Sequence, residues 1–334
     1  MSHSLIVLPD HTAKPILDAI HGARKSLRVK MFVFSHPALV KAVILANKRG
    51  VRVQVMLNPA RRSGEPENEI TGKKLRAAGV EVIDSNPAFE VTHEKSMVVD
   101  DEVAFIQSLN WATKNLAGTR DYAVVTTRGP EVSEVMDCFE ADWARKPFAV
   151  DSSTLLIWCN KNGRDRIAQF IDDAKHTLFV QNERYQDSVI IERLVRAKMR
   201  GVKVHVMARA PHKLKKEKLN EGVSGLRIMD DVGIKVHKLQ HLKLHGKMLL
   251  ADHSRAIIGS INLAPGSFDT RRELAIEVHK AELVNRLQQI VRHDWKHSYP
   301  LDLSDDGLLE EMADHNIDAF SELALNEKRR EQEK

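Results

Sequence analysis

The sequence contains few groups that would cross-link, anchor or metallate the chain. Only two cysteines, Cys138 and Cys159, occur in 334 residues, and their spacing fits no metal site. There is no run of 18 apolar residues and no basic, apolar leader, so we expect neither a transmembrane span nor a cleaved signal. We therefore expect both cysteines to be reduced core thiols in a cytoplasmic protein.

Glycine-rich phosphate-binding motifs are also missing. The chain has no P-loop, no glycine-rich dinucleotide turn and no cluster of metal-ligand residues, so we expect neither a cofactor nor a metal. Hydrophobic residues make up 43% of the chain and charged residues 29%, which is typical of a folded soluble protein. A length of 334 residues is sufficient for two ordinary domains.

The net charge of +5 is distributed unevenly. Residues 301–334 hold 11 Asp and Glu against 4 Lys and Arg, so residues 1–300 carry a net charge of +12. A basic body is suited to anionic partners, such as a phospholipid surface, a phosphodiester substrate or a nucleic acid. Charge alone does not distinguish among them.

One pattern of polar residues occurs twice. His93, Lys95 and Asp100 form an H-x-K-x4-D motif, and the motif returns 152 residues later. A serine and an asparagine follow each copy at the same separation. The two sets are His93, Lys95, Asp100, Ser108 and Asn110, and His245, Lys247, Asp252, Ser260 and Asn262.

The repeat extends beyond these motifs. Residues 20–60 match residues 171–211, and in both segments amphipathic helices alternate with β-branched runs. This alternation predicts an α/β fold with parallel strands joined by helical crossovers, and lysine-arginine-glycine or methionine-arginine-glycine ends a helix in each half. We predict two tandem domains, 1–149 and 150–300, and an acidic helical tail, 301–334, that packs on the body.

The residue types in the motif are suited to phosphate chemistry. On a strand, a histidine and a lysine two residues apart project from the same face. If the repeat brings both pairs together, two imidazoles and two ammonium groups surround one phosphate and stabilise its developing charge. One imidazole can attack phosphorus while the other protonates the leaving oxygen. Ser108, Ser260, Asn110 and Asn262 are candidates for neutral donors to the same oxygens.

Carboxylates are expected to hold this arrangement in place. Asp121 and Glu273 each lie 11 residues after a motif asparagine, and we predict that they orient the imidazoles. Asp100 and Asp252 are expected to support the motif loop instead of taking part in the chemistry.

These motifs resemble those of the phospholipase D superfamily, whose doubled pattern is H-x-K-x4-D-x6-G-S-x-N. The second copy matches in full, and the first departs only at Gln107, where glycine is usual. The family's glycine is interpreted as letting the chain pass close to the phosphate. In proportion, the chain is similar to the small bacterial members grouped with cardiolipin synthases.

The resemblance implies two α/β/α sandwich domains with the active site at their interface. It also implies a metal-independent phosphodiester exchange through a phosphohistidine, with His93 as nucleophile and His245 as general acid and then base. A phospholipid headgroup is the leading substrate, with peripheral membrane contact as part of that hypothesis. A nuclease using the same site and a non-catalytic anion-binding module are the alternatives. A monomer is sufficient for a complete site.

Some further residues have two interpretations each. His241 and Lys243 form a third H-x-K without the aspartate, and we interpret them as surface or pocket-rim residues. Trp111 is expected to pack in the core or at the rim, with stacking on a substrate as the alternative. Trp143 and Trp295 recur at equivalent positions, which favours packing. Residues 212–218 are basic and either recruit a lipid surface or nucleic-acid backbone or are merely solvated.

Overall fold

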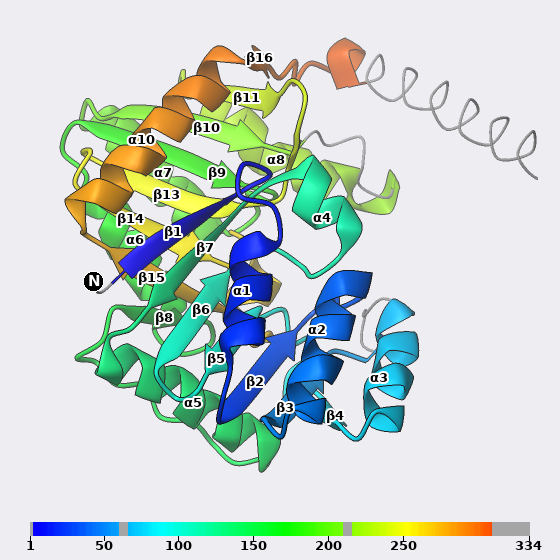
Figure 1. Ribbon diagram of the computed structural model, residues 1–334. Coiled ribbons are helices and arrows are strands. Elements are labelled where there is room, and N and C mark those ends of the chain that lie inside the picture. The colour runs from blue at the N-terminus through cyan, green and yellow to red at the C-terminus, as the bar shows by residue number, and fades with distance from the viewer. Residues whose placement is uncertain (1–2, 60–65, 210–215, 309–334) are drawn as a thin grey trace, which may run out of the picture.

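The computed structural model describes residues 3–59, 66–209 and 216–308, which form two similar halves (Figure 1). The first half contains β1 His3–Leu8, α1 Lys14–Gly22, β2 Ser26–Met31, α2 Pro37–Lys48, β3 Arg52–Leu57, α3 Glu67–Ala77, β4 Glu81–Asp84, β5 Ser96–Val99, β6 Val103–Gln107, α4 Thr113–Gly118, β7 Thr119–Thr126 and α5 Gly129–Trp143. The second contains β8 Leu156–Trp158, α6 Gly163–Asp172, β9 Thr177–Asn182, α7 Ser188–Met199, β10 Lys203–Ala208, α8 Lys216–Asp231, β11 Lys235–Leu239, β12 Lys243–Leu244, β13 Lys247–Ala251, β14 Arg255–Gly259, α9 Pro265–Asp269, β15 Leu274–Val278, α10 Ala281–Lys296 and β16 Ser298–Pro300.

The two sheets have the same strand order. The first runs β1-β7-β6-β5-β2-β3-β4, with β12 beside β7, and the second runs β16-β11-β10-β9-β13-β14-β15-β8. In this order β7, β6, β5, β2, β3 and β4 correspond to β15, β14, β13, β9, β10 and β11. The predicted α/β fold with an internal repeat is therefore confirmed. The domain boundaries at 149 and 300 remain predictions.

The sheets are mixed, and the predicted parallel strands joined by helical crossovers form one part of each. Parallel pairing is found for β2, β3 and β4, and for β9, β10 and β11. The motif strands β5 and β13 instead pair antiparallel with both neighbours. Only residues 100–102 join β5 to β6, and only 252–254 join β13 to β14. Such connections form hairpins, because a parallel pair needs a crossover of a dozen or more residues.

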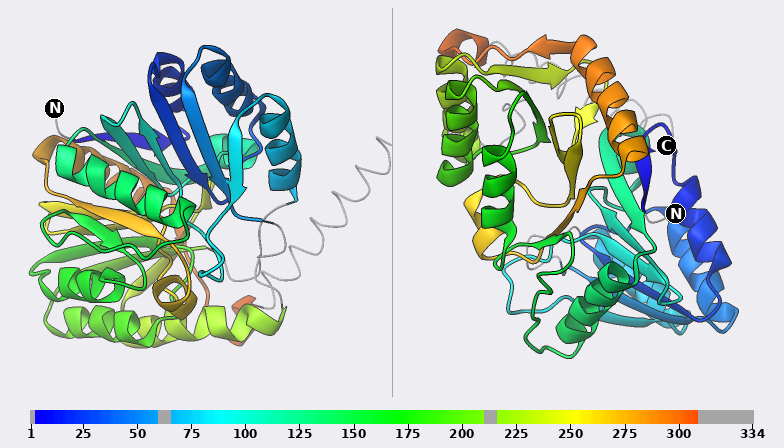
Figure 2. Two further views of the ribbon diagram at one scale, coloured as in Figure 1. Left: turned by 90° about the horizontal axis from the view of Figure 1, so that it is seen from below. Right: turned by 90° about the vertical axis from the view of Figure 1, so that its left-hand side faces the viewer.

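Three apolar clusters organise these elements. One packs the outer face of the first sheet on α1 to α4, and another packs the outer face of the second sheet on α6 to α9. The third joins the inner faces of both sheets to α5 and α10. Figure 2 shows the outer helices of the two halves on opposite sides of the molecule, with the sheets between them. The two halves are thus held together by a shared apolar core.

Glycines end the crossover helices as the sequence predicts. Gly50 and Gly201 follow α2 and α7, whereas Gly79 and Gly233 follow α3 and α8. All four have positive φ angles, between 77° and 91°, which glycine adopts without strain. Each helix therefore turns sharply into the next strand of the parallel run.

Two arginine–aspartate pairs cross between the halves. Arg120 of the first half makes a bidentate pair with Asp294, and Arg272 of the second makes one with Asp142. Their four N–O distances lie between 2.8 and 3.0 Å. The aspartates precede Trp143 and Trp295, whose predicted packing role is confirmed: Trp143 stacks on Phe139 and Trp295 on His237. The recurring Asp-Trp dipeptide thus supplies one interdomain ion pair and one packing ring in each half.

The start of the acidic tail contacts the second half. Leu301, Leu303 and Leu308 are buried in the cluster that includes α6 to α9. The rest of the predicted helical tail lies outside the described residues, as do residues 212–215 of the basic stretch. In the part of the chain that the structure describes, no helix is long and apolar enough to cross a membrane.

Candidate active site

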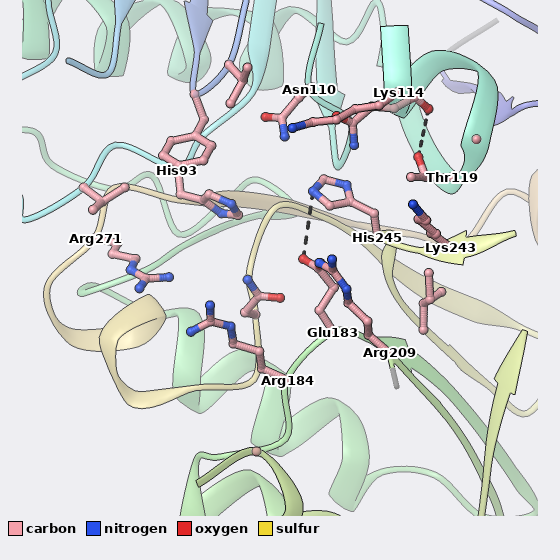
Figure 3. Close-up of a pocket in the computed structure, with 18 of the residues that line it drawn as sticks. His93, Asn110, Lys114, Thr119, Glu183, Arg184, Arg209, Lys243, His245 and Arg271 are labelled. Carbon is pink, nitrogen blue, oxygen red and sulfur yellow. Dashed lines mark hydrogen bonds and ion pairs between the residues drawn. The ribbon is translucent and has the colours of Figure 1, made fainter. Parts of the chain in front are cut away.

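Both motif histidines face one cavity of about 850 Å³ between the halves (Figure 3). His93 precedes β5, and His245 lies between β12 and β13. Asn110 and Asn262 line the same cavity. Figure 3 shows the two imidazoles approaching each other from opposite halves. The structure therefore brings the two motif copies to a single site.

Each imidazole is held by a carboxylate of the other half. His93 Nδ1 lies 2.9 Å from Glu273 Oε2, and His245 Nδ1 lies 2.8 Å from Asp121 Oδ1. Both carboxylates are completely buried. A carboxylate on Nδ1 fixes that nitrogen as the N–H donor and leaves Nε2 for a ligand. Because the pairing is crossed, neither half forms an oriented imidazole alone.

The charges around His93 favour its neutral form. Burial lowers the pKa of His93 well below its usual value, and the positive charges of Lys95 and Lys247 lower it further. Burial also raises the pKa of Glu273, in spite of nearby Lys95 and Arg271. On the other side, burial alone would raise the pKa of Asp121, but His245 and Lys247 hold it below its usual range. Their surroundings therefore shift the pKa values of the two orienting carboxylates in opposite directions.

The motif lysines support the site from behind the histidines. Lys95 Nζ donates to the carbonyl oxygen of His93, and Lys247 Nζ donates to that of His245. Burial lowers the pKa of Lys95 well below its usual range, with a further contribution from Lys247. The two ammonium groups are thus close enough to repel each other, and an anion between the halves would relieve that repulsion.

The motif asparagines line the cavity, and each has a buried oxygen without a partner among the described residues. Asn110 Oδ1 and Asn262 Oδ1 are buried and have no hydrogen-bond partner among the described residues. Buried polar atoms in native structures are nearly always paired, and unpaired ones mark positions where a ligand or water binds. The amide NH₂ group of each asparagine is a candidate donor to a phosphate oxygen.

The motif serines do not face the cavity, which corrects the prediction that they donate to phosphate. Ser108 Oγ donates to Asp121 Oδ1 and accepts from the backbone N–H of Tyr122 at 2.9 Å. Ser260 Oγ accepts from the backbone N–H of Leu274 at 3.1 Å. Both serines are completely buried. They therefore fix the closing strands β7 and β15, and Ser108 also holds the carboxylate that orients His245.

The motif aspartates lie at the hairpin turns, away from the cavity. Asp100 accepts hydrogen bonds from the backbone N–H groups of Arg24, Lys25 and Ser26. Asp252 does the same at residues 175–177 of the second half. Burial alone would raise both pKa values, but these N–H groups hold them below the usual range. Each aspartate thus ties the motif hairpin to the start of the neighbouring strand.

The motif glycine is explained by strand packing. A Cβ atom added to Gly259 would lie 2.3 Å from the carbonyl oxygen of Leu274, on β15. The close approach is therefore to a strand, not to the phosphate. In the first half Gln107 takes this place, and its Oε1 accepts from Trp111 Nε1 at 3.1 Å. Trp111 is completely buried, so its packing role is confirmed.

We expect Gly259→Ala to destabilise the protein by about 1–3 kcal/mol, because β15 backbone has to move to admit the methyl group. Gln107→Ala, the matched change in the first half, opens space instead and removes one hydrogen bond. Urea denaturation of both variants measures the two free energies of unfolding. An unchanged stability of Gly259→Ala would contradict the close-packing explanation.

Several charged residues of the cavity are absent from the motifs. The lining includes one carboxylate and five cations, namely Glu183, Arg184, Arg209, Arg271, Lys114 and Lys243. Glu183 and Arg209 directly follow β9 and β10, at the strand ends where α/β proteins bind ligands. Lys243 lies at the rim, as predicted, whereas His241 is exposed and outside the lining.

Comparison with known proteins agrees with this geometry. The family model "Cardiolipin synthase, PLD-like domain" matches residues 16–143 and again residues 167–295. The chain belongs to this phospholipase D-like family. It is 24% identical to cardiolipin synthase B of Salmonella typhi over 332 residues, covering 84% of this chain and 78% of the relative. The human mitochondrial cardiolipin hydrolase is 33% identical over 132 residues, covering 38% and 49%.

A solved structure has the same fold. The crystal structure of phosphatidylserine synthase from Haemophilus influenzae Rd KW20 superposes with a TM-score of 0.71 at 11% identity, covering 96% of this chain and 94% of that one. The predicted resemblance and the tandem phospholipase D-like fold are thereby confirmed. The chain is a phospholipase D-type enzyme, a phosphodiesterase or phosphatidyltransferase.

Proposed function

We propose that the protein cleaves or exchanges phospholipid headgroups through a phosphohistidine intermediate. The observation that carries the proposal is the pair of imidazoles that face one cavity, each oriented by a carboxylate of the other half. The cationic lining is suited to a phosphodiester anion. The cardiolipin synthase and cardiolipin hydrolase among the relatives support a phospholipid substrate.

In the first step, His93 Nε2 attacks phosphorus and forms an N–P bond while the bond from phosphorus to the headgroup oxygen breaks. His245 Nε2 gives its proton to that leaving oxygen. In the second step, an alcohol or water attacks phosphorus and passes its proton to His245 Nε2 as the N–P bond breaks. Asp121 and Glu273 hold the two rings throughout. Asn110 and Asn262 stabilise the phosphoryl oxygens.

The substrate is tested by offering the candidates together. Purified protein in EDTA receives mixed phospholipid vesicles, a little ethanol and labelled single-stranded DNA, with His93→Ala as the inactive control. We expect phosphatidylethanol, from transfer, or phosphatidic acid, from hydrolysis, and neither product with the variant. Cleaved DNA beside intact lipid would overturn the phospholipid proposal in favour of the nuclease. DNA binding without turnover of either substrate would support the anion-binding module.

We expect the activity to be independent of metal ions. Among the described residues, one group has metal-ligand chemistry, Glu94, Cys138 and Asp142. The ammonium of Lys30 lies 2.9 Å from Glu94 Oε2 and 2.8 Å from Asp142 Oδ2, so a cation of the chain itself already pairs with this group. Turnover after dialysis against EDTA should be unchanged within about twofold. A strict requirement for added Mg²⁺, Ca²⁺ or Zn²⁺ would contradict this mechanism.

A further inference from the structure

The two halves of the site differ at one pair of equivalent positions. The register that pairs residues 20–60 with residues 171–211 also pairs Phe32 with Glu183. Each is the first residue after an equivalent strand, β2 or β9, and each lines the cavity. One position therefore holds an aromatic ring where the other holds a carboxylate.

Phe32 and Glu183 contact the same two partners in their own halves. The ring of Phe32 packs edge-on against His93, with centroids 4.8 Å apart, and Lys95 Nζ lies 5.0 Å from its centroid. Glu183 Oε2 lies 3.9 Å from His245 Nε2 and 2.7 Å from Lys247 Nζ. Figure 3 shows Glu183 directly beside the His245 ring. The residue after each strand thus faces both members of its own H-x-K pair.

This difference affects which of the two imidazoles carries a proton on Nε2. A phosphohistidine mechanism needs one neutral imidazole with a free Nε2 and one imidazole that carries a proton on Nε2. A phenyl ring excludes water and disfavours an imidazolium, whereas a carboxylate within about 4–6 Å stabilises one. His245 has carboxylates on both sides, from Asp121 and Glu183. His93 has Glu273 on one side and Phe32 on the other.

Cations surround the Glu183 carboxylate. Burial alone would raise its pKa, but Lys247, His245 and Arg209 hold it far below its usual range. Arg209 Nη1 contributes an ion pair of 2.9 Å to the other oxygen of the carboxylate. Glu183 is also the only carboxylate among the described residues that line the cavity. The cavity therefore has a carboxylate beside His245 at the position where a phenyl ring lies beside His93.

We propose that Phe32 and Glu183 set the direction of the reaction by deciding which imidazole attacks phosphorus and which donates the proton. The proposal rests on the phosphohistidine mechanism proposed above. The crossed carboxylates orient both rings, and the lysines and the asparagines occur in both halves. Among the neighbours that differ between the halves, Phe32 and Glu183 each contact a motif histidine and its lysine. They act as positioning residues, because they control the protonation of the histidines without bonding to phosphorus.

The decisive experiment exchanges the two residues. Protein is mixed with a short-chain phosphatidylglycerol, quenched in alkali to preserve phosphohistidine, digested, and mapped by mass spectrometry. In the unaltered protein we expect the modified histidine to be His93. In the double variant Phe32→Glu/Glu183→Phe we expect the modified histidine to be His245, because the carboxylate now faces His93. If the double variant is active and its modified histidine is still His93, the proposal is overturned.

A conservative variant keeps the proposal testable if the exchange does not fold. Glu183→Gln preserves shape and removes one charge beside His245, so the imidazolium is less stable. The alkaline limb of kcat/KM should move to lower pH by about one unit, with a roughly tenfold loss of rate above that limb. Glu192→Gln, which changes an exposed carboxylate on α7, should shift nothing. An unshifted limb in Glu183→Gln would overturn the proposal.

Failure of the proposed function has a different result. If the unaltered protein turns over phospholipid but no histidine is modified at any quench time, the phosphohistidine mechanism is wrong. If His93 is modified in the unaltered protein, but neither the site of modification nor the pH profile changes in the variants, the phosphohistidine mechanism stands. Only the direction-setting role of Phe32 and Glu183 is then refuted.

Discussion

Alanine at His93 should abolish turnover, with a loss of about 10⁴-fold or more in kcat, because it removes the attacking nitrogen from the site. The fold should survive, since His93 lines the cavity and is not part of an apolar cluster. His241→Ala is the matched control. It changes an exposed histidine outside the cavity and should leave kcat unchanged.

The pH dependence of kcat/KM is a second test of His93 as the nucleophile. Burial and the nearby Lys95 and Lys247 lower the pKa of His93, so the ring stays neutral to a pH below its ordinary value of 6.5. The acid limb of the profile should therefore lie below pH 6.5, since activity is lost only when His93 becomes protonated. Substantial activity of His93→Ala, or an acid limb above pH 6.5, would show that His93 is not the attacking group.

The sequence predicts the parts of the site that the two halves share. The 152-residue spacing predicts the histidines, the lysines, the asparagines and the orienting carboxylates. It did not reveal that Glu273 holds His93 and Asp121 holds His245, because equivalence along the chain says nothing about which half supplies a contact. The crossing results from the inner faces of the two sheets meeting in one core.

The residues that the sequence did not reveal are those that break the repeat. Glu183 corresponds to Phe32, and Arg209 corresponds to Asn58, so a comparison of shared residues passes over both. Their one available signal was position, since both directly follow strands whose ends form the cavity. The serines differ from the prediction for a related reason. A hydroxyl near a predicted phosphate site is a candidate donor to phosphate, but backbone N–H groups of the adjacent closing strands donate to both hydroxyls.

The buried charges behind the site form a second departure from symmetry. Lys30 in the first half corresponds to Gln181 in the second, and Glu94 corresponds to Gly246. Both halves place an aspartate beside this position, Asp142 or Asp294. The extra cation of Lys30 is therefore balanced by Glu94, whereas neutral Gln181 needs no such carboxylate. An added Cβ on Gly246 would in fact lie 2.8 Å from the ring of Tyr122.

Asp142→Ala should destabilise the protein by about 3–5 kcal/mol, the usual cost of removing one partner from a buried ion pair. Asp142 accepts from Lys30 Nζ at 2.8 Å and from Arg272 Nε and Nη2 at 3.0 Å, and all three side chains are buried. Its loss leaves two buried cations with only Glu94 between them. The free energy of unfolding in urea at pH 7 measures the effect.

Asp294→Ala provides the matched comparison within the same chain. It removes the equivalent partner of Arg120, but Asp10 Oδ1 also lies 3.0 Å from that guanidinium and Gln181 is neutral. We therefore expect a smaller loss than for Asp142→Ala, and an equal or larger one would contradict the charge-balance argument.

At acid pH, the free energies of unfolding of Asp142→Ala and of the unaltered protein should become more similar. Burial alone would raise the pKa of Asp142, but Lys30 and Arg272 hold it below its ordinary value of 3.8. Its contribution to stability is therefore present in full above about pH 3.8 and is lost as the pH falls through the lower folded-state pKa.

Glu94 of this network lies between His93 and Lys95 in the sequence, so the same substitution should also disturb the active site. Stability and the geometry of the phosphate site thus depend on one buried cluster that Arg272 joins from the second half, and the equivalent cluster around Asp294 has fewer charges.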